Sequence, residues 1–146
     1  MKHLVQIMTM TGLLALGSTA YAAELTITVT NIQTPEGKLY IRIYDSGKKW
    51  LSQEENAAHT TEVIPLSVVG DAKEITATFE LSEGKYAVTA IHDKNSNGKT
   101  DISADGGGFS NNPAISIFNL GKPGVEKAAF HVGPGVTKIT INLKYM

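Results

Sequence analysis

Apolar residues occupy every second position in four stretches of the chain, and polar residues, often threonine, lie between them. The four stretches are 25–30, 39–44, 75–81 and 139–144. Alternation with a period of two is typical of a β-strand with one buried face, and the β-branched residues on both faces favour the same assignment. We expect further strands at 62–69, 85–92 and 127–132.

About seven short strands separated by turn residues predict an all-β protein, an antiparallel Greek-key β-sandwich. The segment Thr34-Pro35-Glu36-Gly37 places Pro and Gly where a type I turn accepts them. We therefore expect 25–32 and 38–45 to form a hairpin. Gly70-Asp71 and Gly133-Pro134-Gly135 are the other clear breaks between strands.

The segment from Leu81 to Tyr86, with the sequence LSEGKY, has the spacing of a tyrosine corner. In that motif a tyrosine hydroxyl bonds the backbone a few residues upstream and holds a crossover between sheets. The alternative is an ordinary turn followed by a strand tyrosine. The spacing fits this alternative as well as it fits a tyrosine corner.

Two segments do not have the pattern of a strand. Residues 46–61 predict a loop with a helical turn, in which Trp50 and Leu51 fold back over one end of the core. Residues 93–126 are rich in Gly, Asn, Ser and Pro. Structureless loops of this length are uncommon in compact domains and often have a function.

The N-terminus has the pattern of a secretory signal peptide. Lys2 precedes a mostly apolar run from Leu4 to Leu16, and Ala20-Tyr21-Ala22 is a small-x-small exit. The run is shorter than the roughly 20 residues of a membrane-spanning helix, and a buried N-terminal helix is the alternative. We predict a signal peptide over 1–22, a single β-sandwich domain over 23–146, and no transmembrane segment after cleavage.

Charge and cysteine content narrow the possible functions. Lys2 is the only charged residue before Ala23, so cleavage changes the net charge from −1 to about −2. No basic excess is present to hold nucleic acid. The chain has no cysteine, which excludes disulfides, thiolate metal sites and a cysteine nucleophile. We expect an exported protein, periplasmic or extracellular.

The stretch HDKNSNGKTD, residues 92–101, has oxygen-bearing side chains at alternate positions. Ca²⁺ prefers six to eight such oxygens, and calcium loops supply them from alternate residues around a glycine turn. Gly98 stands at the position of that turn, and Lys99 would contribute only its backbone carbonyl. The predicted Ca²⁺ ligands are Asp93, Asn95, Asn97, Lys99, Asp101 and Asp105.

This loop departs from the EF-hand pattern, and other interpretations of it are open. Ala104 stands where that pattern has a bidentate Glu, and Asp105 comes one residue late. Few carboxylates and two nearby lysines predict weak binding, with a Kd of roughly 10⁻⁴–10⁻³ M. The alternative is a strand end in which Asp and Asn cap their own backbone without an ion. Mg²⁺ is less suitable because it demands small octahedral geometry.

Two neighbouring features offer other chemistry. His92 beside Asp93 could act as a catalytic pair in a hydrolase, with Ser110 as the nucleophile. However, GGGFS is not a nucleophile elbow, and a histidine at a strand end more often bonds a loop carbonyl. The segment Phe109, Ser110, Asn111 and Asn112 could bind a small ligand or a glycan. Its alternative is that Phe109 tucks into the sandwich end and the asparagines cap turns.

The stretch LSEGKYAVTAIHDKNSNGKTD followed by GGGFSNN resembles the signature of an exported bacterial family, domain of unknown function twenty-one forty-one. The strand from Gly37 to Asp45 and the aromatic Trp50 also fit. Here ISADGG is shorter than the corresponding stretch of the family. The resemblance implies a signal peptide and a small β-sandwich, and it implies no activity. More loosely, the chain resembles the prealbumin-like and repeat β-sandwiches of bacterial surface proteins, and the fold class we expect is an Ig-like or prealbumin-like sandwich.

From these observations we expect a non-enzymatic exported β-sandwich with a weak Ca²⁺ site. Its role would be structural or adhesive in the cell envelope, with an envelope protein or a glycan as partner. The alternative is a periplasmic module that binds a small ligand or glycan through Phe109–Asn112. A hydrolase that uses His92 is the least favoured interpretation.

Overall fold

The structure is a computed structural model that describes residues 4–8, 23–45, 49–50, 58–101, 104–114 and 123–145. Strands predominate in these ranges. The strands are β1 (Leu4–Met8), β2 (Ala23–Thr30), β3 (Lys38–Tyr44), β4 (Thr60–Pro65), β5 (Glu74–Leu81), β6 (Gly84–Asp93), β7 (Gly106–Phe109), β8 (Phe130–Val132), β9 (Gly135–Asn142) and β10 (Lys144–Tyr145). A 3₁₀ turn spans Leu66–Val68, and the short helix α1 spans Val125–Ala128.

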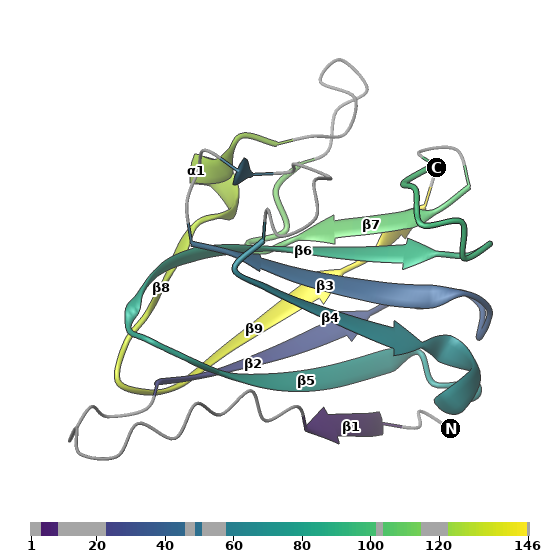
Figure 1. The fold of residues 1–146 in the computed structure, drawn as a ribbon, viewed down its shortest axis with the longest axis horizontal. Helices are drawn as coiled ribbons and strands as arrows, with labels where there is room; N and C mark the ends of the chain where they lie inside the picture. The colour runs from purple at the N-terminus through teal and green to yellow at the C-terminus, as the bar shows by residue number, and fades with distance from the viewer. Residues whose placement is uncertain are drawn as a thin grey trace.

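These strands form two sheets that pack face to face (Figure 1). Sheet A has the order β1-β5-β2-β9, and sheet B has the order β10-β7-β6-β3-β4, with β8 paired to β6. The predicted all-β sandwich is therefore confirmed. Each of the seven predicted strands has a counterpart, and β1, β7 and β10 are additional.

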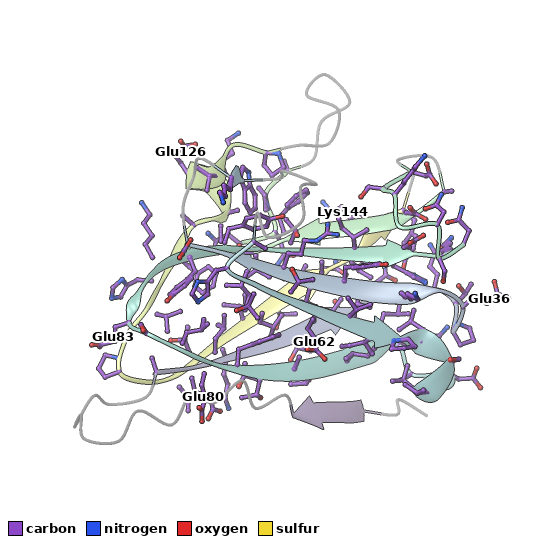
Figure 2. All side chains as sticks on the ribbon, in the orientation of Figure 1. Glu36, Glu62, Glu80, Glu83, Glu126 and Lys144 are labelled. Atoms are coloured by element: carbon purple, nitrogen blue, oxygen red, sulfur yellow. The ribbon has the colours of Figure 1, made fainter. Side chains whose placement is uncertain are left out.

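Alternate residues of both sheets point inward and form one core. Side chains fill the space between the sheets, while Glu36 and Glu83 lie at opposite ends of the molecule (Figure 2). The alternation in the sequence therefore identified the buried face of each strand, as a period of two requires. The largest fully buried side chains are Phe79, Leu25, Ile27, Ile32, Leu39, Ile41, Ile43, Leu66, Ile75, Ile141, Leu143 and His92.

The predicted hairpin between 25–32 and 38–45 is wrong, because β2 lies in sheet A and β3 in sheet B. After β2, Ile32 enters the core, and its amide donates a hydrogen bond to the carbonyl of Lys73 at 3.1 Å. The chain thus crosses between sheets at the Pro35–Gly37 turn. A period of two specifies which face is buried but not which strand lies alongside.

Several strand details also differ from the prediction. The pairs β1–β5 and β2–β9 are parallel, so the sandwich is not purely antiparallel. The stretch 62–69 ends as a strand at Pro65, because the chain then enters a 3₁₀ turn. The start of 127–132 is the end of α1. The 93–126 excursion contains β7, which pairs with β6 and extends sheet B.

Trp50 does not cover an end of the core. Its ring packs against Tyr44 and Phe109, with centroid distances of 5.2 and 6.0 Å. Tyr44 points away from the core because its neighbour Ile43 is a core residue. Phe109 shares this outer face because it pairs with Thr89, which lies between the core residues Val88 and Ala90. The indole nitrogen donates to the carbonyl of Pro123 at 2.9 Å. The predicted plug is therefore a small aromatic layer on the outer face of sheet B; Leu51 lies outside the described residues.

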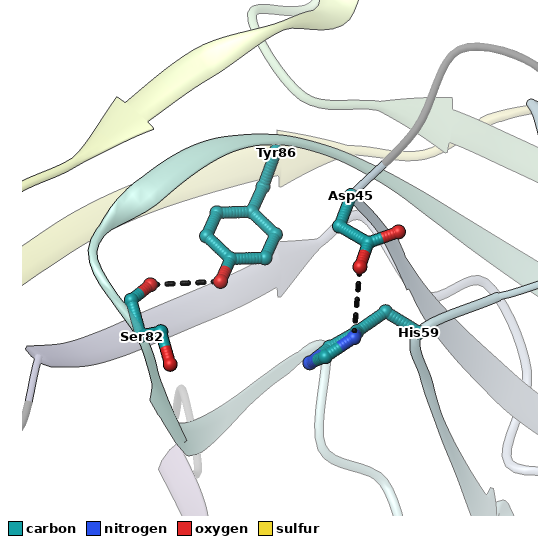
Figure 3. Close-up of polar contacts among 4 residues, drawn as sticks. All are labelled: Asp45, His59, Ser82 and Tyr86. Atoms are coloured by element: carbon teal, nitrogen blue, oxygen red, sulfur yellow. Dashed lines mark hydrogen bonds and ion pairs between the residues drawn. The ribbon is translucent and has the colours of Figure 1, made fainter.

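The tyrosine corner is present where β5 of sheet A leads into β6 of sheet B. The Tyr86 hydroxyl donates to the carbonyl of Ser82 at 2.7 Å (Figure 3). Close by, Nδ1 of His59 lies 3.1 Å from Oδ2 of Asp45. The corner interpretation is confirmed, and the corner holds the end of the sandwich opposite to the one from which β6 leads into the 93–105 loop (Figure 1).

The N-terminal strand β1 pairs with β5 at the edge of sheet A, from Leu4 opposite Glu74 to Met8 opposite Thr78. These residues belong to the predicted signal peptide, and its cleavage stays a prediction. No helix in the described part of the chain has the length and hydrophobicity to cross a bilayer.

Candidate functional site

The candidate site begins at the last residue of β6. Asp93 is buried, with 1% of its surface exposed. Its two carboxylate oxygens accept backbone hydrogen bonds from Asn97 at 3.3 Å and from Gly98 at 2.9 Å. Gly98 has a φ of +74°, a conformation that glycine adopts without strain. Asp93 therefore shapes the turn that follows it.

A second buried carboxylate closes the loop. Asp105 is 5% exposed, and its oxygens accept the backbone amides of Lys94 at 3.1 Å and Asp101 at 2.8 Å. His92 and Gly106 are paired across β6 and β7. Asp93 and Asp105 are the next residues beyond that pair, so the two carboxylates stand on adjoining strand ends.

The remaining predicted ligands lie in the loop between these strand ends. The side-chain oxygen of Asn95 accepts the amide of Asn97 at 3.2 Å, and that of Asn97 accepts the amide of Lys99 at 2.9 Å. The side-chain nitrogen Nδ2 of Asn97 donates to the carboxylate of Asp101 at 2.7 Å. The side-chain oxygens that the pattern identified therefore converge on one short loop, where backbone amides hold them.

Two observations bear on metal binding in opposite directions. Within the residues described, no three His, Asp or Glu side chains group closely enough to hold a metal ion. Yet neither Asp93 nor Asp105 forms an ion pair with a lysine or arginine in those ranges. These two buried carboxylates on neighbouring strand ends lack a basic partner in the described ranges, and a cation would supply the opposite charge.

His92 is fully buried, and both ring nitrogens are engaged. Nε2 lies 2.7 Å from the carbonyl of Glu36, and Nδ1 lies 2.7 Å from the hydroxyl of Tyr145. A carbonyl only accepts hydrogen bonds, so Nε2 carries a proton. The ring therefore joins three segments of the chain.

The Phe109–Asn112 segment is bound closely to the rest of the protein. Ser110 is fully buried, and its hydroxyl accepts the amide of Val88 at 2.9 Å and donates to the carbonyl of Ala128. Asn111 donates to the carbonyls of Lys127 at 3.2 Å and Ala129 at 2.9 Å. These contacts hold the Phe109–Asn112 segment against β6 and α1. They favour the interpretation in which the asparagines cap turns.

Sequence reasoning missed the C-terminal part of this region. Tyr145 hydrogen-bonds His92, and its ring lies over Gly106, where an added Cβ would come within 2.4 Å of ring carbon Cε1. The only local signal was the run Gly106-Gly107-Gly108, whose missing side chains leave space for a neighbour. Nothing in the sequence specifies that this neighbour is Tyr145.

A comparison with family models confirms the resemblance to this family. The family described as "Uncharacterized protein conserved in bacteria (DUF2141)" matches residues 27–140. The chain belongs to this family. The DUF2141 match runs from the middle of β2 to near the end of β9, so it includes the loop and the Phe109–Asn112 segment, while β1 and β10 lie outside it. No curated protein and no solved structure matches the chain.

Proposed function

We propose that this DUF2141 protein is an exported, non-enzymatic β-sandwich whose 93–105 loop binds Ca²⁺. Export is supported by the leader-like pattern of residues 1–22. Ca²⁺ is supported by the alternate oxygen ligands and by the oxygen-only chemistry of the loop. The role we propose is structural or adhesive in the cell envelope, toward an envelope protein or a glycan.

The observation that carries the proposal is the pair of buried carboxylates, Asp93 and Asp105. Each carboxylate oxygen accepts one backbone amide. A carboxylate offers about four acceptor positions, so each retains capacity for a cation. Backbone amides alone compensate the two charges within the described ranges, and Ca²⁺ would supply the missing positive charge.

Amide and carbonyl oxygens would complete the coordination. Asn95 and Asn97 would supply side-chain oxygens, Lys99 a backbone carbonyl, and Asp101 a ligand directly or through water. Two or three carboxylates place the affinity in the weak class, with a Kd of roughly 10⁻⁴–10⁻³ M. Free Ca²⁺ at one to ten times that Kd would stabilise the fold by about 0.4–1.4 kcal/mol.

We also propose that the sandwich is of the Ig-like or prealbumin-like Greek-key class. The tyrosine corner of Tyr86 supports this assignment, because that motif recurs at the sheet crossover of such folds. In this arrangement the loop and the corner would stabilise opposite ends of the sandwich. A bound cation would then stiffen the loop end.

The test is Ca²⁺ titration calorimetry and thermal unfolding of protein expressed from the full-length sequence. Mass spectrometry of the purified protein reads its N-terminus and so tests the leader separately. We expect heat on Ca²⁺ addition and a rise in Tm of about 2–6 °C over the EDTA sample. Asp105→Asn should abolish both, because it removes one buried charge with little change in shape.

Asp71→Asn is the matched control, since Asp71 is an exposed carboxylate in the turn before β5. It should keep the full Ca²⁺ response. Mg²⁺ at the same concentration should give a smaller response than Ca²⁺. If the unaltered protein gives no heat and melts identically in EDTA and in Ca²⁺, the calcium proposal is wrong and the loop is a self-capped turn.

A second candidate function is the binding of a small ligand or glycan near Phe109. One observation favours it: Tyr44, which packs against Trp50 in the aromatic layer, also lines a recess of about 220 Å³, although none of Phe109–Asn112 lines that recess. Tyr44 and Tyr86 line this recess together with Asp45, Lys85 and Glu126. Aromatic faces beside charged groups suit a saccharide or another small polar molecule.

Trp50 provides the test of this alternative because it is the only tryptophan in the chain. Its fluorescence would be followed while monosaccharides and disaccharides are added. A saturable change that Glu126→Gln weakens would support a ligand site. Unchanged fluorescence with every sugar would leave the aromatic layer with a packing role.

A further inference from the structure

The C-terminal strand β10 lies against the two strand ends that carry the proposed calcium loop. Lys144 pairs with Gly107, and Tyr145 pairs with Gly106. The Tyr145 ring occupies the space above Gly106 that a side chain would fill. Gly106 directly follows Asp105 and pairs with His92, which directly precedes Asp93. Tyr145 therefore contacts Gly106 and His92, which are the chain neighbours of the buried residues Asp105 and Asp93.

The hydrogen bonds of Tyr145 and His92 connect this end of β6 to the segment between β2 and β3. His92 donates from Nε2 to the carbonyl of Glu36, and the tautomer with its proton on Nε2 accepts at Nδ1 from the Tyr145 hydroxyl. The same hydroxyl accepts the backbone amide of Gln33 at 3.3 Å. This tautomer, assigned from the network, satisfies every donor and acceptor in the chain of bonds.

Lys94 adds a contact on the other side of Asp93. Its ammonium lies 4.7 Å from the centre of the Tyr145 ring and donates to the side-chain oxygen of Gln33 at 3.2 Å. Tyr145 thus contacts the residue before Asp93 and the residue after it. The Lys94 ammonium therefore faces the Tyr145 ring and Gln33. In the described ranges it forms no ion pair with Asp93 or Asp105.

We propose that Tyr145 and His92 are positioning residues for the 93–105 loop, which couple docking of the C-terminal strand to the order of the loop. Tyr145 fixes the backbone on which Asp93 and Asp105 stand, although it is no ligand itself. The part of this inference that concerns Ca²⁺ rests on the proposed function. Coupling is reciprocal, so an ion that orders the loop would also tighten the C-terminal strand.

Amide hydrogen exchange of the Tyr145→Phe variant tests the inference without any metal. The amides of Lys94, Gly98 and Asp101, which donate to the two carboxylates, report on the loop. The Ile27 amide in the central strand β2 reports on global opening. We expect the loop amides to exchange roughly five- to tenfold faster in EDTA, with a smaller change at Ile27.

Tyr40→Phe is the control for loss of a hydroxyl, since Tyr40 lies on the outer face of β3 against Arg42. It should leave the loop amides unchanged. Gly106→Ala displaces the ring while keeping the hydroxyl, whereas an added Cβ at Gly107 meets nothing within 4 Å. Faster amide exchange in the loop, with a smaller change at Ile27, should therefore appear in Gly106→Ala and not in Gly107→Ala.

Ca²⁺ separates this inference from the proposed function. If Ca²⁺ binds, its Kd should weaken in Tyr145→Phe by a factor similar to the change in exchange. If the unaltered protein does not bind Ca²⁺ but Tyr145→Phe still speeds exchange at the loop amides more than at Ile27, the positioning role stands and the calcium function fails. Equal changes at the loop and at Ile27, or no change at either, would overturn the positioning role.

Discussion

The side-chain oxygen of Asn112 accepts a hydrogen bond from the backbone amide of Asn142 at 2.8 Å. The nitrogen of the same side chain donates to the carbonyl of Thr140, also at 2.8 Å. Asn112 thereby satisfies two outward-facing groups of β9, which pairs only with β2 in the described part of sheet A. Free edge groups recruit other strands, so this side chain protects the edge.

Replacing Asn112 should expose that edge. Asn112 has a φ of +44°, so Asn112→Gly permits the same backbone conformation while it removes the side chain that makes both hydrogen bonds. We expect a loss of about 1–2 kcal/mol in the free energy of unfolding, for two partly solvated hydrogen bonds. We also expect more self-association. Urea unfolding measures the first effect and size-exclusion chromatography the second.

Lys138→Ala is the control for this variant, because Lys138 lies exposed on the same strand. It should change stability by no more than about 0.5 kcal/mol. An Asn112→Gly protein that is as stable and as monomeric as its parent would show that the edge needs no such cover.

The tyrosine corner makes a second prediction. Tyr86→Phe removes the bond from the hydroxyl to Ser82 and little else (Figure 3). The Ser82 carbonyl then loses a partner at a partly buried position, and we expect a cost of about 1–1.5 kcal/mol in unfolding by urea. Tyr40→Phe provides the comparison and should cost less. Equal costs for the two variants would contradict a special role for the corner.

A third prediction concerns alkaline pH. Burial raises the pKa of Tyr44 and of Tyr145, and burial together with the charge of Asp45 raises the pKa of Tyr86. The folded protein therefore holds these phenolic protons more tightly than the unfolded chain, where the pKa is 10.0. Their contribution to stability is complete below pH 10.0 and declines as the pH rises through the folded-state pKa values.

Urea midpoints measured from about pH 8 to pH 11 should fall above pH 10, with tyrosinate absorbance rising in the unfolded protein first. Tyr44→Phe should make that fall shallower, since one buried phenol no longer titrates. Lys138→Ala, measured in parallel, controls for lysine ionisation in the same range. A midpoint that is constant over the whole range would contradict the prediction.

Much of the fold was predictable because the relevant signals are local. The alternation around Leu25, Leu39 and Ile75 marks a buried face within each strand. The LSEGKY segment closes its hydrogen bond over four residues, from Tyr86 back to Ser82. The Asn and Asp side chains of the 93–101 loop likewise meet over a few positions, so their convergence follows from their spacing.

The strand partners and the surroundings of the loop were not predictable in the same way. The Pro35–Gly37 turn is compatible with a hairpin and with a crossover, and contacts of Ile32 with distant residues decide between them. Trp50 is apolar enough for either an end plug or an outer layer. Its partners Tyr44 and Phe109 are brought together by the pairing of β3, β6 and β7.

The sequence by itself determined that this DUF2141 chain is built of strands with a defined inner face, and that residues 93–101 form an oxygen-rich turn. Both follow from interactions within a few residues. Only the tertiary structure decided that Asp105 stands beside Asp93, that Asn112 covers β9 and that Tyr145 reaches His92. These contacts join residues far apart in the chain, and they form only because two sheets bury a common core.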